Sequence, residues 1–180
     1  MLGSSRLVEI LDGAAEPVSL TEAKAQLRVD YSADDTLIES LVSAARHDCE
    51  NYLYISLIPQ RRKALFDCFG PLTMMGPVGS VESVQYLNTE GVLTTLASEA
   101  YRVVEDIVLR IEPVESWPAT SGGKGSVTVT YTTASGAISP GVKTAILLKV
   151  SDMYANREDP TRAKSTLSNN MLDLERVMEF

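Results

Sequence analysis

The sequence predicts an α+β fold in which an antiparallel β-sheet region is inserted into a small α-helical bundle. Apolar residues recur at three- and four-residue spacing from residue 32 to residue 58, which is the pattern of a long amphipathic helix. The same helical spacing of apolar residues returns after Ser139. Between these stretches, residues 61–135 hold short runs rich in Val, Thr and Tyr, separated by Gly and Pro clusters, as is typical of strands. Because helical segments flank the strand-rich segment on both sides, we expect the sheet to be an insertion.

A chain of 180 residues fits one main domain with loosely tied ends. Residues 1–18 are expected to form an N-terminal arm that contains at most one strand. Residues 19–160 are expected to form the main domain, with helices over 19–58 and 139–157 around the β insertion. Residues 161–180 are expected to form a C-terminal tail with a short helix.

Three start signals place the helices. Ser19 and Glu22 form a capping box, in which each side chain can accept from the other residue's backbone amide. A second start lies near Ser32, with acidic residues in the first turn. At the third, Ser139 is a capping residue and Pro140 suits the first helical position, because its missing N–H would have no helical partner.

The β insertion is expected to hold six strands joined by turns. Asn88–Gly91 is a plausible hairpin turn, and Ser121–Gly125 is a flexible loop. The expected strands are Ala64–Phe69, Val81–Leu87, Val92–Leu96, Tyr101–Val104, Ile107–Ile111 and Ser126–Thr133.

Charge and hydropathy exclude several classes of function. With 24 acidic and 16 basic side chains, the net charge of −8 disfavours wrapping around nucleic acid, which requires clustered Lys and Arg. The one basic cluster, Arg61–Lys63, is interpreted as a solvated edge at a helix-to-strand junction. The most apolar run, Ala145–Leu148, is stopped by Lys149 and is far too short to cross a membrane.

The residues that could carry chemistry do not form a recognisable site. His47 is the single histidine, and its sequence neighbours point to other faces of a helix, so no catalytic relay is implied. Cys49 and Cys68 have no metal-ligand spacing, and Cys49 lies on an apolar helix face. The loop Gly122–Gly125 lacks the glycine spacing and the Lys-Ser/Thr pair of a phosphate-binding loop. We therefore expect no catalytic residue, no cofactor and no metal.

The C-terminal tail carries apolar residues among polar ones. Met171, Leu174 and Met178 fall on one face of a short helix, and Phe180 follows. A helix this short is marginal alone in water and needs a surface to pack on. These four residues are the candidate partner-docking residues, although packing on the chain's own bundle is an equal alternative.

Many short segments match one known family in the correct order. They are 17–30, 34–38, 44–46, 50–52, 57–60, 80–84 with Tyr86 and Gly91, 101–103, 117–119, 127–131, Pro140 with Lys143, 145–148 and 154–158. Together these segments resemble a phage head-to-tail connector family, also called head-completion adaptors, over residues 17–158. The sequence departs from the family at Met74–Met75 and at residues 132–135, which affects loop details.

The resemblance implies a structural subunit and no catalysis. Members form a ring, typically twelve-fold, below the portal, and DNA passes through the lumen as cargo. The implied partners are the portal protein, a tail-side stopper or tail-completion protein, and further copies of the chain. No membrane is implied. The implied location is the head–tail interface of the virion, after assembly in the host cytoplasm.

Two other classes of function stay open at this point. A small nucleotide-binding or hydrolytic enzyme would need a true phosphate-binding loop or a second histidine. An acidic inhibitor that mimics DNA would need carboxylates along one face, whereas here they are scattered.

Overall fold

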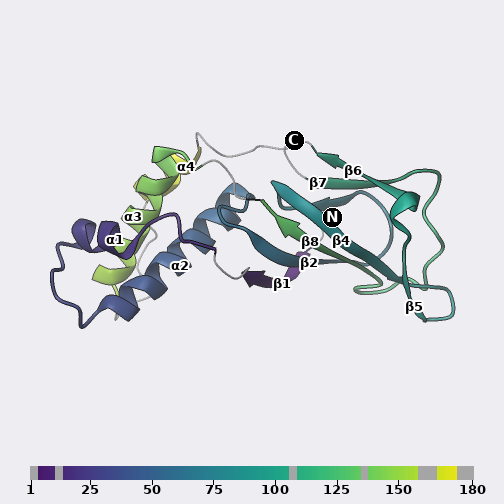
Figure 1. Cartoon of the computed structure of the whole chain (residues 1–180), viewed down its shortest axis with the longest axis horizontal. Helices are drawn as coiled ribbons and strands as arrows, with labels where there is room; N and C mark the ends of the chain where they lie inside the picture. Colours follow the sequence, from purple (N-terminus) through teal and green to yellow (C-terminus); the bar gives the residue numbers. More distant parts are fainter. Residues whose placement is uncertain (1–3, 11–13, 106–108, 135–137, 158–165, 174–180) are drawn as a thin grey trace. The chain divides into compact units, whose positions relative to one another are not determined.

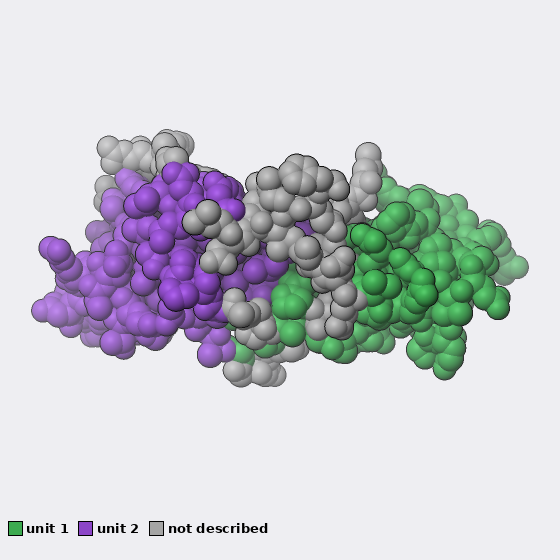
Figure 2. Space-filling model, turned by 90° about the horizontal axis from the view of Figure 1, so that it is seen from above, with its two compact units in different colours: residues 1–14, 58–136 green, residues 15–57, 137–180 purple. Residues whose placement is uncertain are grey.

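The computed structural model describes residues 4–10, 14–105, 109–134, 138–157 and 166–173, and the chain divides into two compact units (Figures 1 and 2). Unit 1 consists of residues 1–14 and 58–136, and unit 2 consists of residues 15–57 and 137–180. Unit 2 therefore holds the helices from both ends of the sequence, and unit 1 holds the strands.

Among the described residues of unit 2, four helices form its structure (Figure 1). They are α1 (Leu20–Leu27), α2 (Asp35–Leu53), α3 (Pro140–Ala155) and α4 (Thr166–Asp173). Their starts follow local chemistry. The capping box at Ser19 is present, with its Oγ accepting from the Glu22 amide at 3.2 Å and Glu22 Oε2 accepting from the Ser19 amide at 2.8 Å. Ser139 caps α3 through its Oγ, which accepts from the Val142 amide at 3.2 Å, and Pro140 is the first helical residue, as expected.

The core of unit 2 lies among these helices. Ile38, Val42 and Leu53 of α2 pack with Val142 and Ile146 of α3, and all five are buried. Burying one such side chain contributes about 1.5–3 kcal/mol relative to leaving it in water. The expected amphipathic pattern of the long helix is therefore confirmed.

The described strands of unit 1 form two antiparallel sheets. The five-stranded sheet has the order β1-β2-β8-β4-β5, and the three-stranded sheet has the order β3-β7-β6. The strands are β1 (Ser4–Ile10), β2 (Gln60–Phe66), β3 (Leu72–Met74), β4 (Val78–Leu87), β5 (Leu93–Thr95), β6 (Tyr101–Glu105), β7 (Leu109–Pro113) and β8 (Val127–Thr133).

A second apolar core lies between the inner faces of the two sheets. Alternate residues of β2 are buried, including Ala64 and Phe66, and they pack with Val129 of β8, Leu72 of β3 and Ile111 of β7. This period of two is the signature of a sheet with one buried face. The α+β fold class predicted from the sequence is confirmed.

The hairpin turn at Asn88 is also confirmed. The Gly91 amide donates to the Asn88 carbonyl at 2.9 Å, and Asn88 Oδ1 accepts from the amides of Glu90 and Val92. Gly91 has a φ of 76°, which is the left-handed region that glycine enters without strain. The turn fixes β5 against β4.

Several sequence-based expectations were wrong in detail. The basic cluster is no solvated edge: it lies inside β2, where Arg62 is buried and Arg61 pairs with Glu82 at 2.8 Å. β3 was not expected, because Leu72–Met74 lies between prolines and glycines that favour turns. The insertion forms two sheets. Part of the expected strand Ile107–Ile111 lies outside the described residues.

Candidate docking site

The residues singled out for possible chemistry are engaged in holding the fold. His47 is exposed on α2, with Nδ1 3.9 Å from Glu50 Oε2. Arg46, which is buried, reaches the same Glu50 oxygen with Nη1 at 2.6 Å, and Asp48 accepts from Lys149 Nζ at 2.6 Å.

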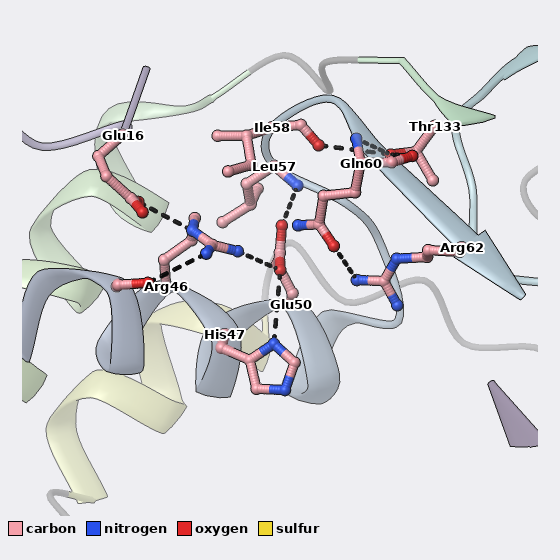
Figure 3. A network of polar contacts seen from close by, with 10 residues as sticks. Glu16, Arg46, His47, Glu50, Leu57, Ile58, Gln60, Arg62 and Thr133 are labelled. Atoms are coloured by element: carbon pink, nitrogen blue, oxygen red, sulfur yellow. Dashed lines mark hydrogen bonds and ion pairs between the residues drawn. The ribbon is translucent and has the colours of Figure 1, made fainter. Parts of the chain in front are cut away.

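Glu50 and Arg46 form the most buried ion pair of unit 2 among those identified in the described residues (Figure 3). Arg46 Nη1 lies 2.6 Å from Glu50 Oε2, and both residues are almost fully buried. The other Glu50 oxygen accepts from the Leu57 amide at 2.7 Å, and Arg46 Nε donates to Glu16 Oε2 at 2.8 Å. The pair thus ties the segment before α1 and the exit from α2 to the same point, and its role is structural.

In unit 1, a second set of polar contacts fixes the start of β2 (Figure 3). Arg62 Nη2 donates to Gln60 Oε1 at 2.7 Å, and the Gln60 amide donates to Thr133 Oγ1 at 3.0 Å. The Thr133 hydroxyl also lies 3.3 Å from the carbonyls of Ile58 and Gln60. Buried polar groups require such partners, so these contacts stabilise the pairing of β2 with β8.

The cysteines and the glycine loop show no reactive arrangement. Cys49 is buried, and burial raises the pKa of its thiol to about 12. Cys68 is exposed. In the glycine loop, the Gly125 amide donates to Asp67 Oδ1 at 3.2 Å, so a carboxylate already accepts from this amide. Within the described ranges, no group of three His, Cys, Asp or Glu residues could hold a metal ion.

The helix α4 lies against the other helices of unit 2 by one face. Ser168 and Leu172 are buried, and Asn169 Oδ1 accepts from Lys149 Nζ at 3.2 Å. The Tyr52 hydroxyl donates to Asp173. These contacts join α4 to α2 and α3, so the described part of the tail is an integral element of the helical unit.

The candidate docking residues divide between described and undescribed parts of the chain. Met171 is partly buried and packs against the core of unit 2. Leu174, Met178 and Phe180 lie outside the described residues. Leu167, which was not singled out from the sequence, is 60% exposed one turn before Met171 on the same side of α4. The signal in the sequence is the spacing of four residues between Leu167 and Met171, which places both on one face of a helix.

None of the helices in the part of the chain that the structure describes is both long and apolar enough to cross a membrane. The ion pairs and hydrogen bonds described above hold the helices of unit 2 and the strands of unit 1 in place.

The chain belongs to the family of phage gp6-like head–tail connector proteins, whose model matches residues 17–178. Its function is accordingly that of a head–tail connector, a structural component at the junction of head and tail in the virion. The sequence-based assignment to this family is confirmed. No curated protein matches the sequence.

Solved structures with a similar fold come from gene transfer agent (GTA) particles. One is the neck of an empty particle computed with C6 symmetry, with a TM-score of 0.72 and 19% identity. Another is the virion of the native particle, with a TM-score of 0.71 and 21% identity. A third is the neck of the native particle computed with C12 symmetry, with a TM-score of 0.70 and 20% identity. Each comparison covers 97% of both chains, so the likeness in fold spans both units.

Proposed function

We propose that this protein assembles into a ring, twelve-fold in the mature particle, between the portal protein and the next tail component of a tailed phage or phage-like particle. It acts by assembly and docking, without catalysis, and DNA passes through the ring as cargo. The observation that carries the proposal is the match of the connector family to residues 17–178. The occurrence of the same fold in necks computed with C6 and C12 symmetry supports a cyclic arrangement.

The test is co-assembly with the portal protein encoded in the same genome. We expect electron microscopy of the mixture to reveal a second ring stacked on the portal, and particles without this protein to lack an attached tail. A mixture in which the portal ring stays bare would refute the proposal. The rival class, a small nucleotide-binding or hydrolytic enzyme, is favoured by no contact in the described residues.

We further propose that the C-terminal tail takes part in docking to the portal or to a neighbouring copy. The support is the exposed side chain of Leu167, together with a sequence that continues the same helical spacing through Met171, Leu174 and Met178. Methionine side chains adapt to a partner's groove at little cost.

Two truncations separate docking from folding. A chain that ends at Asp173 keeps the buried contacts of α4 and removes Leu174, Met178 and Phe180. We expect it to keep the melting temperature of the full chain and to bind portal-containing heads more weakly. A chain that ends at Ser165 also loses Leu172, so it serves as the destabilised control. Unchanged binding by the Asp173 truncation would refute docking by this segment.

A further inference from the structure

The strand β5 is a three-residue edge strand that carries no charged side chain, no proline and no bulge. It ends the five-stranded sheet and has one neighbour, β4, among the described strands. Its residues Leu93, Thr94 and Thr95 are uncharged, and the preceding turn residue, Val92, is apolar. Val92 is 54% exposed and Leu93 is 60% exposed. Edge strands of monomeric proteins are normally very short, charged, bulged, covered or interrupted by Pro, because unpaired backbone groups recruit other strands. β5 is short, and it lacks charge, proline and bulge.

The hydrogen-bond pattern identifies which backbone groups of β5 point outward. The Asn88 amide donates to the Val92 carbonyl at 3.0 Å, and the Leu96 amide donates to the Val84 carbonyl at 2.8 Å. Hydrogen-bonded and non-hydrogen-bonded pairs alternate in an antiparallel ladder, so the pairs of Leu93 and Thr95 are the non-bonded ones. The N–H and C=O groups of both residues therefore face away from β4.

The two edges of the three-stranded sheet, β6 and β3, are guarded. On β6, Arg102 Nη2 forms an ion pair across to Glu112 of β7 at 2.7 Å. All three residues of β3 are buried. On β1, the register shifts between Ser5 and Leu7, which interrupts the regular edge. Only part of β1, Leu7–Ile10, pairs with β2 in unbroken register.

We propose that β5 of one copy pairs with the Leu7–Ile10 segment of β1 in the next copy, so that neighbouring sheets join edge to edge around the ring. This inference rests on the proposed ring. β5 and β1 are the two opposite edges of the same sheet, so their contact is heterologous and continues from copy to copy. Pairing of β5 with β5 would be isologous and would stop at a dimer. The regular segment of β1 and the three residues of β5 are also of similar length.

Crosslinking tests whether β1 of the next copy is the strand that pairs with β5. Cys68→Ser removes the exposed native thiol, and Leu93→Cys and Glu9→Cys place thiols on β5 and β1. Within one copy, these edges are four strand spacings apart, about 19 Å, which a short bismaleimide does not span. In portal-bound rings, we expect the double-cysteine chain to give a ladder of crosslinked oligomers. If a chain with Leu93→Cys but without Glu9→Cys gives crosslinked dimers, β5 pairs with β5 and the proposal is overturned.

A charge on the edge tests the pairing itself. Leu93→Lys adds a charged side chain that disfavours pairing with another strand at this edge. Val114→Lys is its matched control, since Val114 is 59% exposed elsewhere in unit 1. We expect Leu93→Lys to weaken ring formation on the portal about tenfold, the effect of losing one or two net hydrogen bonds, and Val114→Lys to leave it unchanged. In wild-type rings, the Leu93 and Thr95 amides should exchange with deuterium more slowly than in the monomer.

The outcomes separate this inference from the proposed function. If the wild-type chain forms no ring with the portal, the proposed function fails. If it forms a ring in which both lysine variants assemble equally well and the two amides exchange as in the monomer, the ring stands and the edge pairing is wrong.

Discussion

Replacing Glu50 with glutamine tests whether the buried ion pair holds unit 2 together. Glu50 accepts from Arg46 at 2.6 Å and from the Leu57 amide at 2.7 Å, and its side chain is fully buried. Glutamine keeps the shape but loses the charge, and its NH₂ group cannot accept from either donor. Breaking a buried pair by removing one partner costs about 3–5 kcal/mol, because the remaining charge stays out of water.

The matched control is Glu16→Gln. Glu16 accepts from the same guanidinium at 2.8 Å, but its side chain is 31% exposed, so water can replace the lost contact. We expect this variant to lose about 1 kcal/mol or less. Domain stabilities are about 5–15 kcal/mol, so the Glu50 variant should lose a large fraction of the stability of unit 2.

The two units can be followed separately in urea. Trp117, the single tryptophan, stacks on Phe69 in unit 1 with ring centroids 4.6 Å apart, so its fluorescence reports on the sheets. The four α-helices of the described residues all belong to unit 2, so circular dichroism near 222 nm reports on that unit. We expect Glu50→Gln to shift the dichroism transition more than the fluorescence transition. If Glu50→Gln and Glu16→Gln lose equal amounts of unfolding free energy, the structural role assigned to the Arg46–Glu50 pair is refuted.

Three further predictions concern acid, thiols and α4. The pKa of Glu22 is lowered from 4.5 to about 2, mainly by the hydrogen bond from Lys143. The ionised Glu22 side chain therefore stabilises the fold above about pH 4.5, and this stabilisation is lost as the pH falls toward 2. Glu22→Gln should flatten this part of a stability-against-pH curve, and an unchanged curve would contradict the prediction. Iodoacetamide at about pH 8 should label Cys68 in the native protein and Cys49 only in urea, because burial raises the pKa of the Cys49 thiol to about 12; mass spectrometry would reveal early Cys49 labelling if this is wrong. Leu172→Ala should lower the unfolding free energy by about 2–5 kcal/mol, since Leu172 is fully buried, whereas a loss below about 1 kcal/mol in urea titrations would mean that α4 does not belong to the core.

The helices were the most predictable part of the fold because their signals are local. The capping box at Ser19, the proline at residue 140 and the long amphipathic pattern of α2 each depend on residues within one or two turns. One boundary differed slightly. Asp34, rather than Ser32, occupies the N-cap of α2: its carbonyl accepts from the Ile38 amide at 2.8 Å, and Ser32 lies in a turn before the helix.

The sheets were predictable only in outline, because strand pairing is not local. Arg62 is buried next to Gln60, and these two residues look like surface residues in the sequence. Thr133, which fixes the start of β2, lies 73 residues from Gln60. The separation into two sheets follows from such distant pairings, which the period-two pattern does not specify.

The functional surfaces were the least predictable part, for a related physical reason. A catalytic site concentrates reactive side chains, which sequence patterns can indicate, whereas an assembly surface can consist of backbone groups that lack a neighbour. Leu93 and Thr95 are ordinary strand residues, and they become candidates only because the strand order leaves them at an edge without charge, proline or bulge. The same two residues in a central strand would be inert. For a connector, the strand order of the sheet is therefore as informative about assembly as any motif, and the Leu93→Lys and Val114→Lys comparison measures that contribution directly.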